Sequence, residues 1–469
     1  MKHPDDKHHA MRDIENALDQ CPFKGYRIGP SVSDYLVHYV LNENYSSYMF
    51  LRYLAKAWIA GFKPHTKRNY PDNWAGKVIF TWINQRPELA ELVLPLVDVF
   101  GRGALVVGSS GEMKAALPAD VSFIAADEIM SFHWIEWFRR FLWTGTKAKF
   151  LLLRCVVKGK LPLKAFPLMM YGLIVQTQRL LAAEQFIAQV RPKAIVTEYD
   201  RSIDTSCLML AADRAAVPTI TMVHGAINPY PAYGMFPIIA DYVMCWGELQ
   251  KAQFIVCGVP PEKLQITGCH RLSRKLKADR NEVRQRLGIE AGATVVTLAT
   301  NPIRPDLKLQ LARKFCEGVF VGKGVVGMIR LHPGEVPAEY ASVTQDFPGL
   351  KVVPNKTLSV DESLAVSDIV ACHNTGYGSD ALIKGVPVVV LDVIDQPLLN
   401  AQELIDKAGC VRAVSSEKLR AAIQGFVTGG ADRMSLSESA ESYVQALCSA
   451  FDKEALANAV RLIKDVDHA

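Results

Sequence analysis

Short apolar runs alternate with helical stretches along most of the chain, and this alternation occurs in two separate series. The first series opens with the strand-like run Lys77–Trp82 and the apolar helical stretch Glu88–Phe100, and the second opens with the run Thr294–Ala299. Because parallel strands are joined by crossover helices, each series predicts an open parallel sheet. A chain of 469 residues also exceeds one ordinary hydrophobic core. We therefore expect an α/β protein with two Rossmann-like domains facing a central cleft, with extra helices at both ends.

The domain boundaries follow from changes in this pattern. Apolar residues recur at helical spacing near the N-terminus until Pro64 and Pro71 interrupt them, and the charged stretch 271–290 is typical of a linker. The predicted organisation is a helical region at 1–72, a first α/β domain at 73–272 with a basic aromatic insertion at about 130–175, a second α/β domain at 273–435, and C-terminal helices at 436–469.

Composition excludes several classes of protein. The net charge of +5, from 53 basic and 48 acidic residues, is too small to indicate a nucleic-acid partner. The ten cysteines lie singly with no Cys-x-x-Cys pair, which argues against a disulfide framework and a structural zinc. The charged N-terminus lacks a secretory h-region, and the longest apolar stretch, 165–175, is about half of a membrane span. We expect a cytoplasmic protein without a metal.

Two constellations in the second series follow strand-like runs. The first is Arg330-Leu331-His332-Pro333-Gly334-Glu335. Strand C-termini face the ligand crevice of open α/β sheets, so Arg330 and His332 could bind phosphate, and Glu335 could accept from a ribose or base. The alternative is a loop histidine before a turn-forming proline.

The second constellation is the glycine-rich turn His373-Asn374-Thr375-Gly376-Tyr377-Gly378-Ser379, which precedes a helix. Glycines allow a ligand to approach the backbone closely, and a helix N-terminus offers unpaired N–H groups to phosphate. The alternative is a capped helix whose glycines only form the turn. Asn301 and Arg304, after the first strand of this series, add a weaker candidate for a diphosphate or a sugar carboxylate.

Candidate bases follow strands of the first series. Glu198 and Asp200 come directly after one strand, and either carboxylate could deprotonate an acceptor hydroxyl. Asp200 could equally cap the next helix or pair with Arg201. His224 follows the next strand and could act as a base or position a phosphate, unless it is a satisfied structural histidine.

Residues 132–164 combine aromatic and basic side chains with the single acid Glu136. Tryptophan and basic residues on a helix suit the interface of an anionic membrane. A core-facing aromatic stripe with a solvated basic face is the alternative. We therefore expect a peripheral contact with the inner membrane through 132–164 as one of two interpretations.

Taken in chain order, these motifs resemble those of GT-B glycosyltransferases of bacterial capsule, lipopolysaccharide and teichoic acid synthesis. The matching residues cover roughly 76–400 and are Thr197-Glu198-Tyr199-Asp200, Val223-His224-Gly225, Ala240 to Glu248, Gly258-Val259-Pro260, Lys263, Thr267-Gly268, Arg330-Leu331-His332-Pro333, and the glycine-rich turn before Gly385-Val386-Pro387.

This resemblance implies a donor nucleotide held by the second domain and a glycan or glycolipid acceptor held by the first. The His332-Pro333 pair is similar to that of bacterial sialyltransferases and 3-deoxy-manno-octulosonic acid (Kdo) transferases, in which the histidine meets the CMP phosphate. A CMP-linked acidic sugar is then the implied donor, and Asp200 or Glu198 the implied base. The nucleotide sugar is a substrate, and no other cofactor is implied.

Departures from the pattern define the alternatives. CDP-glycerol phosphotransferases carry Asp-Tyr-Ser-Ser where this chain has the turn from His373. UDP-N-acetylglucosamine 2-epimerases use Thr-x-His-Arg-x-Glu-Asn where this chain has Thr300-Asn301-Pro302-Ile303-Arg304. Both activities are therefore less favoured than glycosyl transfer, and a membrane-docked binding protein without catalysis is a third alternative.

Overall fold

The computed structural model describes most of the chain, with gaps. The described residues are 4–20, 22–32, 51–52, 55, 69–83, 86–129, 142–159, 161, 163–223, 225, 238–301, 303–320, 324–428 and 437–467.

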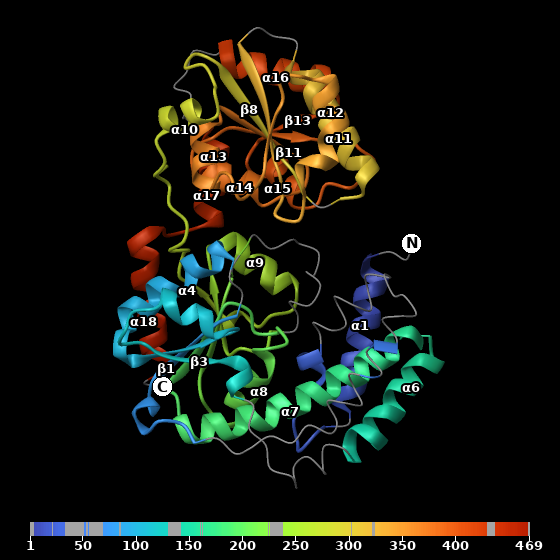
Figure 1. The fold of residues 1–469 in the computed structure, drawn as a ribbon, viewed down its shortest axis with the longest axis vertical. Helices are drawn as coiled ribbons and strands as arrows, with labels where there is room; N and C mark the ends of the chain where they lie inside the picture. Colours follow the sequence, from blue (N-terminus) through green and yellow to red (C-terminus); the bar gives the residue numbers. More distant parts are fainter. Residues whose placement is uncertain are drawn as a thin grey trace.

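The first domain is built on a sheet of seven parallel strands in the order β3-β2-β1-β4-β5-β6-β7 (Figure 1). Its central strands are apolar and buried throughout, as expected where helices cover both faces of a parallel sheet. The strands are β1 Val78–Trp82, β2 Ala104–Gly108, β3 Ser122–Ala125, β4 Ala194–Thr197, β5 Thr219–Met222, β6 Tyr242–Cys245 and β7 Leu264–Ile266. The helices are α1 Pro4–Asp19, α4 Pro87–Phe100, α6 Lys149–Val157, α7 Phe166–Val190, α8 Ser206–Arg214 and α9 Glu248–Val256.

The second domain has a sheet of six parallel strands in the order β10-β9-β8-β11-β12-β13. The strands are β8 Thr294–Ala299, β9 Val325–Arg330, β10 Lys351–Val353, β11 Ile369–Cys372, β12 Val388–Leu391 and β13 Val411–Ala413. The helices are α10 Arg280–Arg286, α11 Pro305–Val319, α12 Ala341–Asp346, α13 Val360–Val366, α14 Tyr377–Ile383, α15 Asn400–Asp406 and α16 Ser416–Thr428. The two parallel sheets confirm the prediction of a two-domain α/β fold.

The N-terminal helix α1 belongs to the core of the first domain. Ile14 and Leu18 lie in the same hydrophobic cluster as Ile79 and Leu105 of the central strands. An ion pair between Glu15 and the fully buried Arg201 ties α1 to the loop that follows β4. The first domain therefore includes α1 as well as the sheet.

The C-terminal helices α17 (Glu438–Leu447) and α18 (Asp452–Asp467) return the chain to the first domain. Helix α17 packs on α14 and α9, and α18 packs on α4 (Figure 1). The returning segment lies beside the outgoing one, since the amide of Cys269 donates to the carbonyl of Ala450 at 3.0 Å. Two adjacent chain segments thus cross between the domains.

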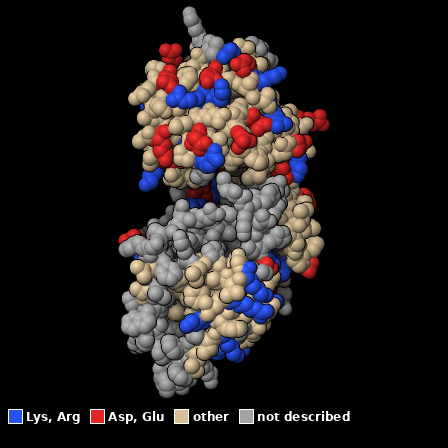
Figure 2. Space-filling model, turned by 90° about the vertical axis from the view of Figure 1, so that its right-hand side faces the viewer, with Lys and Arg blue, Asp and Glu red and all other residues tan. Residues whose placement is uncertain are grey.

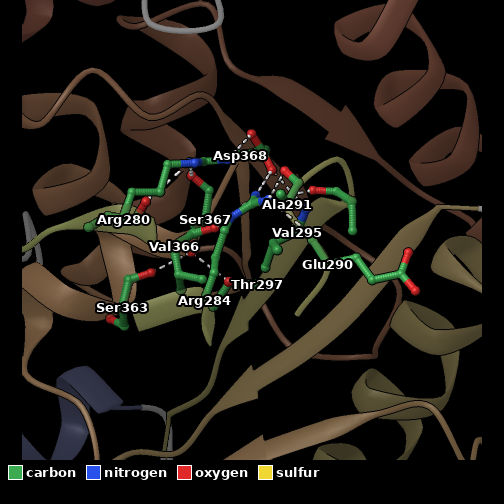
Figure 3. Close-up of polar contacts among 12 residues, drawn as sticks. Arg280, Arg284, Glu290, Ala291, Val295, Thr297, Ser363, Val366, Ser367 and Asp368 are labelled. Atoms are coloured by element: carbon green, nitrogen blue, oxygen red, sulfur yellow. Dashed lines mark hydrogen bonds and ion pairs between the residues drawn. The ribbon is translucent and has the colours of Figure 1, made fainter. Parts of the chain in front are cut away.

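The linker helix α10 is fixed to the second domain by a buried ion pair (Figure 3). The guanidinium of Arg284 contacts the carboxylate of Asp368 at 2.8 Å and donates to the carbonyl of Ala291 at 3.0 Å. Asp368 also accepts from Arg280 and from the amide of Val295 at the start of β8. This network lies at the beginning of β8 and β11, opposite the strand ends that face the first domain.

Among the described helices, none combines the length and the apolar composition that crossing a membrane would require.

Candidate functional site

Each sheet has a point at which the strand order reverses, between β1 and β4 in the first domain and between β8 and β11 in the second. Ligands of open α/β sheets bind beyond the carboxyl ends of the strands near such points. The candidate residues of the sequence follow β4, β8, β9 and β11, so the topology places them at the relevant edges.

A cavity of about 710 Å³ lies between the domains at these edges. Its wall combines the first turns of α4, the crossing segment from His270 to Ser273, the start of α10, the end of β9, the beginning of α13 and the second half of α14. A volume of 300–1,000 Å³ is usual for small-molecule sites. Its charged lining residues are Glu88, Glu91, Arg271, Lys277, Asp279, Glu282, Arg330, Asp361, Glu362, Asp380 and Lys384.

Arg330, the last residue of β9, lines this cavity in a fixed orientation. Its Nε donates to the hydroxyl of Ser363 at 2.9 Å, and its guanidinium lies 5.2 Å from the ring centroid of Tyr377. The hydroxyls of Ser363 and Tyr377 are hydrogen-bonded to each other. The second domain thus holds a preoriented cation at the cavity, which suits an anionic ligand.

His332 is half-buried and follows the end of β9, but it is not among the residues that line the cavity. Its Nδ1 accepts from the amide of Gly334 at 3.2 Å, so in the neutral ring Nε2 carries the proton. Burial lowers the pKa of His332, and the positive charge of Arg86, at the start of α4 in the other domain, lowers it further. A neutral imidazole whose Nε2 has no hydrogen-bond partner among the described residues is compatible with the predicted phosphate contact.

Glu335 is occupied within its own domain. Its carboxylate accepts from the hydroxyl of Thr300 and from the amide of His332 at 3.0 Å. The other oxygen contacts Lys308 Nζ at 3.0 Å and the hydroxyl of Tyr340 at 3.2 Å. This geometry does not support the predicted contact with a ribose or base, and Glu335 instead holds the His332 loop to the end of β8. Pro333 is exposed in the turn that it forms.

Most side chains of the glycine-rich turn make contacts within the second domain. His373 is fully buried, and its Nδ1 donates to the carbonyl of Leu391 at 2.8 Å, so it does not reach a ligand. The side-chain amide of Asn374 bonds Pro397 and Leu399, and Thr375 accepts from the amide of Tyr377.

The last part of this turn is packed into the domain. A side chain at Gly378 would meet Leu404 at 2.8 Å, and Ser379 contacts Tyr443 of α17. Gly376 alone is exposed at the start of α14, a helix of seven residues.

The two candidate residues after β8, Asn301 and Arg304, have different environments. The carbonyl oxygen of the Asn301 side chain is buried without a hydrogen bond among the described residues. Arg304 is 60% exposed and pairs with Asp306 at the start of α11. Arg304 is therefore directed along its own helix and not into the cavity.

The two predicted bases of the first domain, Glu198 and Asp200, are buried just after β4 and do not line the cavity. Glu198 accepts from the amide of Ile83 at 2.6 Å and from the hydroxyl of Thr81 at 2.8 Å, which joins β4 to β1. Asp200 is buried, accepts from the amides of Ile239 and Ala240, and has a pKa raised by burial. The geometry supports structural roles for both. His224 and the aromatic residues 132–141 lie outside the described residues.

The structure adds site residues that the sequence interpretation missed. Arg271 lines the cavity, and in the described part of the chain it has no hydrogen bond or ion pair, with Nε buried. Carboxylates led by Asp380 raise the pKa of Arg271 although burial opposes its charge. Glu88 and Glu91 lie one turn apart on α4 and line the same cavity. The position of α4 directly after β1 was the available signal, because its first turn must lie at the sheet edge.

Comparisons with known proteins identify the fold. Neither a protein-family model nor a curated protein matches the chain. Among solved structures, a Listeria monocytogenes protein described as a UDP-N-acetylglucosamine 2-epimerase is 15% identical over 83% of this chain and 96% of its own, with a TM-score of 0.52. Anabaena HepE in complex with UDP is 14% identical over 84% and 100%, with a TM-score of 0.51.

A glycosyltransferase from Rickettsia africae is 10% identical over 84% of this chain and 98% of its own, with a TM-score of 0.52. At these identities the likeness shows the fold alone. The chain has the two-domain α/β fold of the GT-B type, as the motif order predicted.

Proposed function

We propose that this protein is a glycosyltransferase that binds a nucleotide-activated sugar in the cavity between its domains. The observation that carries the proposal is the cavity itself, in which Arg271 from the crossing segment and Arg330 from β9 converge. Guanidinium groups bind phosphate through charge-assisted hydrogen bonds. His332, at the same sheet edge but outside the cavity lining, is a further candidate donor through Nε2, which has no hydrogen-bond partner among the described residues.

Transfer requires a base for the acceptor hydroxyl and donors for the leaving phosphate. In the proposed step the hydroxyl oxygen bonds to the anomeric carbon, its proton passes to a carboxylate, and the bond to the nucleotide phosphate breaks. Glu88 and Glu91 are better placed for this role than Glu198 or Asp200, because both line the cavity. Burial raises the pKa of Glu91, which makes its carboxylate a stronger base.

The donor nucleotide has two candidates. The His332-Pro333 pair favours a CMP-linked acidic sugar such as sialic acid or Kdo, whereas the similar Anabaena structure holds UDP. A glycan or glycolipid is the proposed acceptor in either case.

Thermal unfolding with CMP, CDP, UMP, UDP and GDP tests the site and selects the donor. A ligand at 100 times its dissociation constant stabilises the native state by about 2.7 kcal/mol, so one nucleotide should stand out. An increase in Tm with CMP alone supports a CMP-linked acidic sugar as the donor. A larger increase with UDP or GDP would instead indicate a donor that carries that nucleotide. No shift with any of the five contradicts the proposed site.

Nucleotide release from the selected sugar donor, measured with and without a glycan acceptor, tests the reaction. Nucleotide release that depends on the acceptor supports transfer. The substitution His332→Ala should lower the rate of this release strongly while it changes the free energy of unfolding little. Conversion of the donor without an acceptor would favour the 2-epimerase alternative, which the Listeria neighbour suggests.

A further inference from the structure

Helix α6 exposes apolar side chains on the side that faces away from the protein core. Leu152 and Cys155 are buried against the first domain. Phe150, Leu153 and Val157 are 68%, 40% and 87% exposed, and their spacing of three and four residues places them on one opposite face. Just beyond the helix, Leu163 is 65% exposed. Large apolar side chains exposed together on one face of a helix can mark a contact surface.

Basic residues flank this strip on both sides. Lys149, Arg154 and Lys158 are exposed on α6 or at its end, and Lys147 is exposed just before it. The sequence from 142 to 163 contains no acidic residue. Helix α6 lies at the right-hand edge of the first domain in Figure 1, and Figure 2, which looks onto that side, shows Lys and Arg gathered on the described surface of the first domain.

We propose that the protein docks on an anionic lipid bilayer through this α6 face, defined as Lys147, Lys149, Phe150, Leu153, Arg154, Val157 and Lys158. The helix lies parallel to the membrane, with its three apolar side chains among the acyl chains and its cations at the lipid phosphates. An apolar strip between basic borders is the pattern of interfacial helices. Basic residues near an anionic leaflet attract it electrostatically.

Charge distinguishes a bilayer from a second copy of this chain. A two-fold symmetric dimer through the α6 face would place each basic border against that of its partner. Like charges opposed in this way disfavour association. An anionic membrane instead complements both borders at once, so the observations favour the lipid surface.

Co-sedimentation of the full chain with vesicles tests this proposal. We expect binding to phosphatidylcholine vesicles that contain phosphatidylglycerol, little binding to pure phosphatidylcholine, and weaker binding as salt increases. Each of Lys149→Gln, Arg154→Gln and Lys158→Gln should lower the partition coefficient roughly fivefold. Phe150→Ser should lower it about tenfold or more. The substituted side chains are exposed, so the variants should retain the wild-type Tm.

A control on the second domain uses similar exposed side chains of α16, with Lys418→Gln and Phe426→Ser. These variants should bind vesicles as the wild type does. Equal binding by the α6 and α16 variants overturns the proposal, as does equal binding to both kinds of vesicle. Light scattering that shows a dimer dissolved by Phe150→Ser would assign the face to a second copy instead. The nucleotide-dependent shifts are independent of all these outcomes.

Discussion

The guanidinium of Arg271 lies over the indole ring of Trp246, 5.7 Å from the ring centroid. The indole Nε1 donates a hydrogen bond of 2.8 Å to the carbonyl of Val223, which fixes the ring on the first domain. A cation held over an aromatic face is oriented before a ligand arrives. Arg271 is thus a preorganised cation at the point where the chain crosses between the domains.

Arg271→Gln should weaken binding of the nucleotide that gives the largest thermal shift by about 10- to 100-fold. A hydrogen bond to a charged group contributes about 1.5–3 kcal/mol, and 1.4 kcal/mol corresponds to a factor of ten. Isothermal titration measures the change. Arg313→Gln, which removes a surface pair with Asp346 away from the cavity, is the matched control. Equal nucleotide affinity of the Arg271→Gln variant and the wild type would show that Arg271 does not bind the nucleotide.

The position of the catalytic base can be decided by three amide substitutions. Glu88→Gln and Glu91→Gln replace carboxylates of the cavity, and we expect one of them to lower kcat by about 100-fold or more. Glu198→Gln places an amide group against the donors Ile83 N–H and Thr81 O–H. It should therefore lower the free energy of unfolding by about 1–3 kcal/mol and affect kcat less. A large loss of kcat in Glu198→Gln with an unchanged Tm would restore Glu198 as the base.

Most of the fold could be predicted from the sequence, because buried strands of parallel sheets are short continuous apolar runs. β1 and β8 begin and end within one residue of their predicted bounds. β13 was missed, since only Ala413 of its three residues is buried and an edge strand leaves a weak apolar signal. Helix α7 begins at Phe166, within the predicted insertion at about 130–175, because its first half is apolar on nearly every side and has no clear periodicity.

The candidate site was less predictable because burial depends on tertiary packing. Glu335 follows a strand end as a ligand-binding residue would. Thr300 and Lys308, from an earlier part of the chain, and Tyr340 nonetheless surround it. Arg271 stands in a charged stretch that suggests a solvated linker. Only the packing of the two domains shows that it lines a cavity.

His373 should make stability depend on pH. Its Nδ1 donates to Leu391, and its Nε2 is buried with no acceptor among the described residues, so a second proton would have no partner. Burial accordingly lowers the pKa of His373 below the ordinary value of 6.5. The unfolded chain then binds more protons, so the contribution to stability is complete above pH 6.5 and is lost as the pH falls toward the folded-state pKa.

His373→Asn keeps an N–H donor near the Nδ1 position and removes the titrating group. The difference in free energy of unfolding between wild type and variant should therefore decrease as the pH is lowered from 7 to 5, a range on either side of about 6.5. Urea denaturation at several pH values measures this difference. Parallel pH profiles for the two proteins would contradict the prediction.

The close approach of the two crossing segments can be tested with two glycines that have similar positive φ angles. Gly268 and Gly258 have φ of +78° and +85°, so alanine at either site costs about 1 kcal/mol from the left-handed conformation alone. A Cβ at Gly258 meets nothing within 4 Å, whereas one at Gly268 would lie 2.3 Å from the carbonyl oxygen of Ala450. Gly268→Ala should therefore lower the free energy of unfolding by about 2–4 kcal/mol, since backbone must move to relieve the contact. Gly258→Ala should lower the free energy of unfolding only by the conformational cost of about 1 kcal/mol. Thermal unfolding of both variants measures the difference. Equal losses would mean that the segments 268–269 and 450–451 can separate without cost, and that the returning helix α18 does not constrain the crossing.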